Sequence, residues 1–410
     1  MKVVVLGGST PHTVGLVEDL LEQGHAGDPR IDLMLVGRNE ELLEDVRAFC
    51  NRRIQAIQAA ERLQVHASTD ATAASHGADL FVFQVRPGGL AGRASDETFP
   101  LDFGIPGDEG LGPGGLAAAK RNFLVFASLL PAVQASPTAP ILMLTNPLGL
   151  SGRWFQENHA GQVLGVCELP QVTLEHAIGH AVDANTDAAY AGLNHQGFWH
   201  RIRQGTRDVL PETLATAPKW MHHPKAAGAL PLSYWRLYFD RAAVVREQRQ
   251  RQATRAATLT DLCTLLHQEC REGDGSSPLP SGQQRAKPWY SMVVTPMLLA
   301  RARGLSMTLF ANQAAGPQHA FAAPACQVER RILWGQTTEA LAEEAVPRGL
   351  LPLLQQVAEA EEAAWHACAH GNAQALKDCL RAMPLCEHLS NAERADLAET
   401  IRRTGESQCV

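Results

Sequence analysis

No basic stretch offsets the acidic surplus of this chain. Its 410 residues include 36 Lys and Arg against 43 Asp and Glu, which gives a formal net charge of −7 at pH 7. Proteins that bind nucleic acid depend on clusters of Lys and Arg that neutralise phosphates. The acidic residues are scattered rather than run together, so they indicate ordinary solvated surface. This balance excludes nucleic acid as the main partner.

Long apolar runs are also missing. No apolar stretch approaches the roughly 20 residues that a membrane-spanning helix needs. The first residues, MKVVVLGGST, begin directly with a strand pattern and lack the longer apolar core and cleavage site of a signal peptide. We therefore expect a cytoplasmic protein with no membrane partner.

The nine cysteines form no CxxC pair and follow no regular spacing. An odd number of cysteines scattered between Cys50 and Cys409 is typical of reduced thiols rather than of a disulfide framework. Most of them, such as Cys368, Cys379 and Cys386, are expected to be inert.

The first half of the chain alternates short apolar runs with helical patterns. Residues 2–8, 31–38, 79–85 and 140–147 have the composition of buried strands, and amphipathic stretches such as 14–24 lie between them. Nearly continuous apolar runs separated by helices are typical of a parallel sheet covered on both faces. The predicted fold class is α/β, with a Rossmann-like doubly wound parallel sheet followed by an α+β domain, an architecture like that of the lactate and malate dehydrogenases.

We place the dinucleotide-binding domain at residues 1–165, and the domain for metal binding, substrate binding and oligomerisation at 166–410. Residues 86–115, with nine glycines and four prolines, predict a long loop at the carboxyl edge of the sheet, where ligands bind. Residues 246–273 predict one long exposed helix. From about residue 346 the pattern indicates two or three structural helices.

The turn GGSTPHTVG follows the first strand and opens a helix, so its backbone amides are placed to hold a pyrophosphate. It departs from GxGxxG, because serine stands at the second glycine position and histidine at the third. An ordinary strand–helix turn is the alternative, but the position at the first such turn favours a dinucleotide site. The candidate cofactor-binding residues are Gly7, Gly8, Ser9, Thr10 and His12.

The second strand ends on Val36-Gly37-Arg38-Asn39, without the acid that usually holds the adenosine ribose of NAD. An arginine after glycine is the arrangement that accommodates the 2′-phosphate of NADP. The alternative is an exposed Arg38 with NAD held by other contacts. Both cofactors therefore remain open.

Three further candidates follow predicted strands at the same edge of the sheet. Asn146, in the sequence TNP, lies where nicotinamide and substrate would meet, although Asn-Pro is also a common turn. Cys167 ends the next strand, and His195 follows another apolar segment. A lone cysteine or histidine is more often structural, but their shared edge makes a joint metal site plausible.

Six motifs resemble one family in their order and spacing. They are RPGGLAGRASDE, GIPGDEGLGPGG, LTNP, GVCELP, AGLNHQG and ALPLSYWRLYF, and the segments RAKPWYS and LPLLQQVAEAEEAAWHACAHGN agree with them. Together they resemble glycoside hydrolase family 4 over nearly the whole chain, most closely its 6-phospho-β-glucosidase branch.

The resemblance implies an enzyme that uses NAD and a divalent metal, usually Mn²⁺, to cleave glycosides, and that forms dimers or tetramers. The implied route is oxidation at C3, removal of the C2 proton, elimination of the aglycone, addition of water and re-reduction. The cofactor is regenerated at each turnover, so the net reaction is hydrolysis.

The resemblance also implies roles for individual residues. Cys167 and His195 match the metal ligands, and Tyr234 matches the tyrosine that removes the C2 proton, with Tyr238 one turn later as a competitor. Asn146 matches an asparagine that contacts sugar hydroxyls. Arg93 matches a position expected to hold the 6-phosphate, and Arg285 is a second candidate; either could instead pair with a carboxylate, such as Asp96 or Glu97.

The chain departs from the family pattern in three places. Gly107-Asp108-Glu109-Gly110 replaces GQET, and Arg285-Ala286-Lys287-Pro288 replaces RGGA. Glu168 follows the metal cysteine, where β-acting members have Asn and α-acting members have an Asp that can serve as acid. The alternatives are therefore an unphosphorylated, uronate or α-linked glycoside, the last with Glu168 as acid. A 2-hydroxyacid-type dehydrogenase and a divergent binding protein stay open as other classes.

Overall fold

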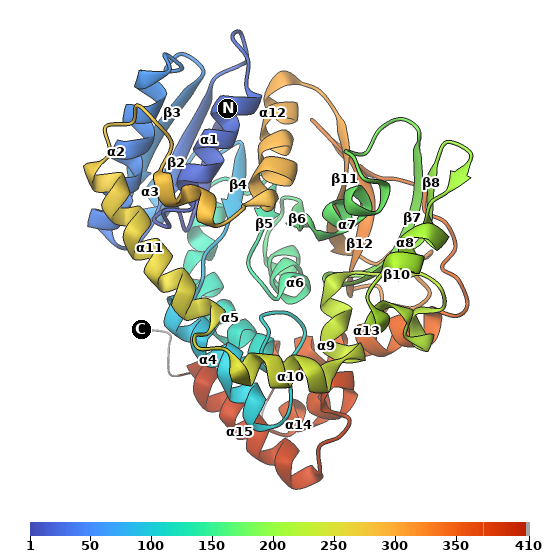
Figure 1. Ribbon diagram of the computed structural model, residues 1–410. Coiled ribbons are helices and arrows are strands. Elements are labelled where there is room, and N and C mark those ends of the chain that lie inside the picture. Colours follow the sequence, from blue (N-terminus) through green and yellow to red (C-terminus); the bar gives the residue numbers. More distant parts are fainter. Residues whose placement is uncertain (372, 407–410) are drawn as a thin grey trace.

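A nine-stranded sheet organises the protein, whose computed structural model describes residues 1–371 and 373–406 (Figure 1). The strand order is β13-β12-β11-β6-β5-β4-β1-β2-β3, and β1 to β6 are all parallel. The order 3-2-1-4-5-6 is that of a doubly wound dinucleotide-binding sheet. The predicted fold class is therefore confirmed. The parallel strands are β1 (Lys2–Leu6), β2 (Ile31–Val36), β3 (Leu63–Ser68), β4 (Leu80–Phe83), β5 (Ile141–Met143) and β6 (Val163–Val166).

Alternation along β1 shows why this sheet needs helices on both faces. Val3 and Val5 pack into one apolar cluster, whereas Val4 and Leu6 pack into another on the opposite face. Successive side chains of a strand point to opposite faces, so a strand that is apolar throughout is stable only when both faces are covered. The helices over the first face are α1 (Thr13–Gln23), α2 (Glu40–Ala56), α11 (Arg255–Glu272) and α12 (Thr295–Arg303).

The second face is covered by helices from the first half of the chain, and the C-terminal helices pack on these and lie together at the lower end of the molecule in Figure 1. The predicted helical tail is confirmed. The helices on this face are α3 (Ala71–Ser75), α5 (Pro113–Gln134), α6 (Leu148–Asn158), α13 (Leu351–Ala369), α14 (Ala373–Ala382) and α15 (Asn391–Glu406).

Strands from the second half of the chain extend the main sheet. β11 (Met307–Ala314) pairs antiparallel with β6, and β12 (Gln327–Trp334) and β13 (Thr338–Ala340) continue outward from it. A smaller antiparallel sheet lies beside them (Figure 1). Its strands are β7 (Thr186–Leu193), β8 (Gln196–Gln204), β9 (Arg207–Asp208) and β10 (Leu230–Pro231), with α7 (Leu169–Ile178), α8 (Leu210–Thr216) and α9 (Arg236–Phe239) nearby.

The prediction of one long loop at residues 86–115 is wrong. Residues Gly89–Asp102 form helix α4, and α5 already begins at Pro113. The glycines that suggested a loop gather at the two ends of α4, where Gly88 and Gly89 turn the chain with positive φ values of 78° and 59°. Eleven of the 14 residues of α4 are neither glycine nor proline, and the helix packs against α5 and α11.

The prediction of one exposed helix at residues 246–273 is also wrong. α10 (Arg241–Gln250) is followed by an extended Arg251, and α11 begins at Arg255. Thr254 caps α11 by accepting a hydrogen bond of 3.0 Å from the Ala257 amide. α11 also buries Leu259, Leu262 and Leu266, so it is a packed helix rather than a solvated one.

One helix has the length of a membrane-spanning segment. α5 has 22 residues and is apolar enough to cross a membrane by length and composition. In this fold it contacts α4, α13 and α15, and its Arg121 is buried against Asp96. All eight cysteines within the described ranges are free thiols, as predicted, and Cys409 lies outside those ranges.

Glu361 of α13 is a carboxyl group buried behind the sheet. Its Oε1 accepts hydrogen bonds from the Gln327 amide at 3.1 Å and from the Cys326 thiol at 3.4 Å. Burial raises the pKa of Glu361 to about 7. The folded protein therefore binds a proton here over a pH range in which the unfolded chain has already released it.

We expect Glu361→Gln to remove part of the pH dependence of stability. Because the pKa is higher in the folded state than the ordinary 4.5, wild-type stability falls as pH rises from about 4.5 to about 7. The variant should gain on wild type between pH 5 and pH 7.5, by on the order of 2 kcal/mol, seen as a rising difference in melting temperature. Glu359→Gln, an exposed change on the same helix, is the control. Parallel melting curves for Glu361→Gln and wild type would contradict this account.

Candidate active site

The turn between β1 and α1 has the backbone of a dinucleotide-binding turn. Gly7 adopts φ +95°, and the Gly7 and Gly8 amides both donate to the Val36 carbonyl, at 3.0 and 2.8 Å. A Cβ on Gly8 would lie 2.8 Å from that of Leu35, so the close approach of the turn to β2 requires glycine. Ser9, Thr10 and His12 then carry the chain to Thr13, where α1 begins.

His12 is buried in this turn without a charge of its own. Burial, followed by the positive charges of Arg285 and Lys287, lowers its pKa to about 3. Its Nε2 lies 3.7 Å from the Cys263 sulfur on α11, and its Nδ1 has no hydrogen-bond partner among the described residues. Positive charge near the turn therefore comes from the neighbouring arginines and lysine and not from the imidazole.

Arg38 is exposed beyond the end of β2, and within the described ranges no carboxylate pairs with it. The next residue, Asn39, caps α2 by accepting a hydrogen bond of 3.0 Å from the Leu42 amide. The guanidinium is thus available at the edge where an adenosine ribose would bind, and the choice between NAD and NADP stays a prediction.

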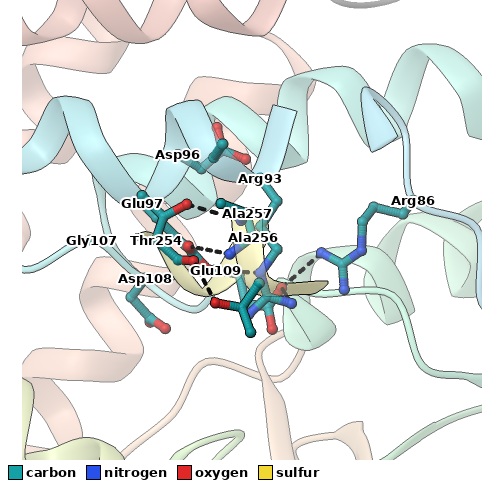
Figure 2. A network of polar contacts seen from close by, with 12 residues as sticks. Arg86, Arg93, Asp96, Glu97, Gly107, Asp108, Glu109, Thr254, Ala256 and Ala257 are labelled. Carbon is teal, nitrogen blue, oxygen red and sulfur yellow. Dashed lines mark hydrogen bonds and ion pairs between the residues drawn. The ribbon is translucent and has the colours of Figure 1, made fainter. Parts of the chain in front are cut away.

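Two arginines converge on Glu109 at the carboxyl edge of the sheet (Figure 2). The Glu109 Oε2 atom lies 2.8 Å from Arg86 Nη1 and 3.2 Å from Arg93 Nη1. Burial alone would raise the pKa of Glu109, but the charges of Arg86 and Arg93 outweigh it and hold the pKa well below its ordinary value. Glu109 is therefore a buried anion between two cations.

Arg93 is largely engaged in this network. Its Nε donates to Glu97 Oε1 at 2.7 Å, and the other Glu97 oxygen accepts from the Ala256 amide at the start of α11, at 3.0 Å. The side chain is 6% exposed. The alternative left open by the sequence, a carboxylate partner for Arg93, is what the structure contains (Figure 2).

Arg285 forms no ion pair with a carboxylate of the described residues. It stacks on Trp289, with its guanidinium carbon 4.8 Å from the ring centre, and its Nε is buried without a hydrogen bond among the described residues. Burial, then the like charges of Arg255, Arg93 and Arg86, lower its pKa to about 10. Like charges gathered in a partly buried place favour binding of an anion, so Arg285 is the better placed of the two phosphate candidates.

A small cavity joins this network to the end of β5. The Asn146 carbonyl accepts a hydrogen bond of 2.8 Å from the Asn122 side chain, which fixes the loop after β5 against α5. Thr145 donates to the Val85 carbonyl at 2.8 Å and ties the same loop to β4. Lining residues that the sequence analysis did not assign are Gln84, Arg86, Glu109, Arg121 and Asn122; Arg93 and Asn146 line it as well.

The predicted metal ligands are Cys167 and His195. Cys167 is a half-buried free thiol just after β6, and burial, then Glu168 and Glu329, raise its pKa well above the ordinary value. His195 occupies the β7–β8 turn with φ +68°, and burial lowers its pKa to about 4, so the imidazole is neutral.

The donor atoms fit a cation in one respect. His195 Nδ1 is buried and has no hydrogen-bond partner within the described residues, which leaves a neutral nitrogen free to bind a metal. No group of three His, Cys, Asp or Glu side chains gathers in the part of the chain that the structure describes. Protein ligands of these types would therefore number fewer than three, leaving positions for oxygen atoms of substrate or water.

The two candidate tyrosines differ in what their hydroxyl groups do. The Tyr234 ring stacks on His195, with centres 3.8 Å apart and planes 14° apart, and its hydroxyl makes no hydrogen bond to any described residue. Burial, then Asp108 and Glu109, raise the pKa of Tyr234 well above 10. Tyr238 instead donates to the Leu111 carbonyl at 3.1 Å. Only Tyr234 has a hydroxyl that is free for a substrate.

Glu168 lies between Cys167 and the first turn of α7. It is half-buried and forms no ion pair with any described residue. Burial raises its pKa, while the charges of Arg285 and Arg255 oppose that effect. A carboxyl group in this state is able to hold a proton for a leaving group, so its predicted role stays open.

Sequence analysis gave no role to Arg86, Asp108 or Glu109. The departure GDEG marked the place of the two acids, but charge partners cannot be read from a motif. Burial and then the neighbouring Glu109 raise the pKa of Asp108 to about 6, so this buried acid differs sharply from the adjacent, ionised Glu109.

Comparisons with known proteins show the family of the chain. The model for "Family 4 glycosyl hydrolase" matches residues 2–182, and that for its C-terminal domain matches residues 190–386. A probable 6-phospho-beta-glucosidase of Bacillus subtilis is 26% identical over 316 residues, which are 71% of each chain. A 6-phospho-beta-glucosidase of Thermotoga maritima is 32% identical over 215 residues, or 51% of this chain and 50% of that one, so the match spans half of that relative.

Solved structures give the same result for the fold. The 6-phospho-beta glucosidase from Thermotoga maritima, solved with manganese, NAD⁺ and glucose-6-phosphate, superposes with a TM-score of 0.85 at 22% identity, over 100% of this chain and 99% of that one. Malate dehydrogenase from Aeropyrum pernix gives 0.54 at 10% identity, over 89% and 97%. The expected dehydrogenase-like architecture and the family resemblance are both confirmed, and the chain belongs to glycoside hydrolase family 4.

Proposed function

We propose that this enzyme hydrolyses 6-phospho-β-glucosides by oxidation at C3, removal of the C2 proton, elimination, addition of water and re-reduction. NAD would supply reversible hydride transfer, and a divalent cation, Mn²⁺ in our proposal, would polarise the sugar oxygens. The observation that carries the proposal is the stack of the Tyr234 ring on the imidazole of His195, whose Nδ1 has no hydrogen-bond partner among the described residues.

Each candidate residue would have a role that depends on its position in the site. The turn at Gly7–His12 would hold the cofactor pyrophosphate, and Asn146 would contact the sugar where it meets the nicotinamide. Cys167 and His195 would bind the cation, and Tyr234 would take the C2 proton. Because burial raises the pKa of Tyr234, loss of its proton requires a nearby positive charge, which a bound cation would provide.

Two alternatives keep the scaffold and change the reaction. An unphosphorylated, uronate or α-linked glycoside, the last with Glu168 as acid, fits the departures at Asp108, Glu168 and Ala286. A 2-hydroxyacid-type dehydrogenase would fit the fold alone. A panel of nitrophenyl glycosides, with and without a 6-phosphate and with α and β linkages, separates these outcomes when assayed with NAD, NADP and Mn²⁺. Release of nitrophenol from phosphorylated β-glucosides only, without net NADH, is the expected result. A cytoplasmic location and a homodimer or homotetramer stay predictions.

Arg285→Ala should weaken glucose 6-phosphate binding by about 10- to 100-fold, because a charged hydrogen bond is worth about 1.5–3 kcal/mol. Binding of glucose should change little. Calorimetric titration of both sugars measures the difference, and Arg38→Ala, an exposed arginine at the other end of the site, is the matched control. Equal weakening for both sugars would show that Arg285 does not contact the phosphate.

A further inference from the structure

Glu329 is a buried acid on the strand behind the proposed metal site. It lies on β12 opposite Asn312 of β11, and Asn312 in turn lies opposite Gly165 of β6, two residues before Cys167. A Cβ on Gly165 would lie 2.8 Å from that of Asn312, so glycine leaves room for the Asn312 side chain above β6. Because β12, β11 and β6 are adjacent strands, Glu329 lies behind Cys167, the residue that follows β6.

Three neutral donors surround the Glu329 carboxylate. Its Oε1 accepts from the side chains of Asn194 at 3.2 Å and Asn312 at 3.3 Å, and its Oε2 accepts from the Tyr190 hydroxyl. The residue is 2% exposed, and no described Lys, Arg or His forms an ion pair with it. A carboxyl group buried without a cation is costly to the fold. A buried acid of this kind is therefore expected where it has a functional role, because an apolar side chain would otherwise fill the same space at lower cost.

Asn194 connects this carboxylate to both proposed ligands. It immediately precedes His195 in the β7–β8 turn, and its side chain also lies against the Cys167 sulfur, where it favours the thiolate. Glu329 thus fixes the side-chain amide of Asn194, which lies between the end of β6 and the β7–β8 turn. These two segments belong to different sheets. The competing interpretation is that Glu329 only joins the two sheets and has no bearing on the ligands.

We propose that Glu329 is a positioning residue, which fixes Asn194 and thereby the placement of Cys167 and His195 for one cation. This inference rests on the metal site of the proposed function. Ligands of a metal are commonly oriented by such outer hydrogen bonds, whose loss costs about 10- to 100-fold in metal affinity.

Affinity for Mn²⁺, measured by electron paramagnetic resonance titration of the full-length protein, tests the proposal. Glu329→Ala should weaken Mn²⁺ binding by about 10- to 100-fold. Glu329→Gln should recover most of that loss, because its carbonyl oxygen accepts from both asparagines and its amide donates to the Tyr190 oxygen. Glu361→Ala, which removes another buried acid next to β12, is the matched control and should bind Mn²⁺ like wild type.

Hydrogen–deuterium exchange of the metal-free protein gives a second readout, independent of any metal. Glu329→Ala should speed exchange in the β7–β8 turn, residues 193–197, while Glu329→Gln and Glu361→Ala should leave it unchanged. If Glu329→Ala fails to fold, Asn194→Ala removes only the linking amide and should weaken Mn²⁺ binding by a similar factor.

The outcomes separate the two proposals. Wild-type Mn²⁺ affinity in Cys167→Ser and His195→Ala would overturn the metal site and this inference with it. Loss of affinity in those variants, with wild-type affinity in Glu329→Ala or Asn194→Ala, would overturn the positioning role alone. Equal weakening in Glu329→Ala and Glu329→Gln would also overturn it, because the charge and not the placement would then matter.

Discussion

His195→Ala should lower manganese-dependent turnover by about 10³-fold or more, and Cys167→Ser should have an effect of similar size. A cation bound by these side chains would stabilise charge that develops on the sugar, an effect worth several kcal/mol, and each 1.36 kcal/mol is tenfold in rate. His195 contributes a buried nitrogen that has no other partner among the described residues, so its loss leaves none of them to take its place. Serine keeps the size of Cys167 but does not ionise, which removes the charge that a thiolate offers the cation.

The measurement is kcat/KM on a nitrophenyl 6-phospho-glycoside across a Mn²⁺ titration. His200→Ala, on strand β8 and outside the site, is the matched histidine control and should stay within a few-fold of wild type. Full activity of both variants over the whole titration would show that the cation, if one is used, binds elsewhere.

Tyr234→Phe should lower kcat by about 10²- to 10⁴-fold, the usual contribution of a general base. Phenylalanine keeps the ring that stacks on His195 and removes only the hydroxyl, so the fold and the ligand geometry are preserved. Exchange of the C2 proton of the sugar with solvent should fall by the same factor. Tyr238→Phe, which loses a hydrogen bond to the Leu111 carbonyl, should cost less than about tenfold in kcat.

Comparing the two tyrosines, which lie one helical turn apart, tests which of them removes the C2 proton. If Tyr238→Phe abolishes C2 exchange and Tyr234→Phe does not, the roles are reversed. If neither changes the exchange rate, no tyrosine in this segment removes the proton.

The parallel sheet could be predicted because the apolar pattern that produces it can be seen in short stretches of the sequence. β1 is apolar on both faces, with Val3 and Val5 on one face and Val4 and Leu6 on the other. When strands of this kind alternate with helical patterns, few folds other than a doubly wound sheet can bury them. The carboxyl-edge location of Asn146 and Cys167 followed from the same rule. The pairing of β11 with β6 could not be predicted, since an antiparallel strand that arrives some 140 residues later leaves no mark on the local pattern.

The failures at residues 86–115 and 246–273 have a common physical reason. Gly88 and Gly89 suggest a loop, whereas they only turn the chain into α4. α10 ends at Gln250, and Thr254 starts α11 by a single side-chain hydrogen bond, which a polar, helix-favouring composition hides.

Only some of the ion pairs of the site could be predicted. Arg93 matches a phosphate position, and its pairing with Glu97 one turn later is the alternative that the sequence leaves open, whereas its motif says nothing of Glu109 in a separate loop. Arg285 has no carboxylate partner in the part of the chain that the structure describes, and this feature favours it over Arg93 as the phosphate-binding residue.

Turnover of a 6-phospho-β-glucoside in D₂O, with NAD and Mn²⁺ present, tests the central claim most directly. The account predicts that the glucose 6-phosphate released carries one deuterium at C2 per turnover, while NADH does not accumulate. Release of the aglycone without deuterium at C2 would contradict the elimination route, and NADH that accumulates in step with substrate consumed would show a dehydrogenase instead.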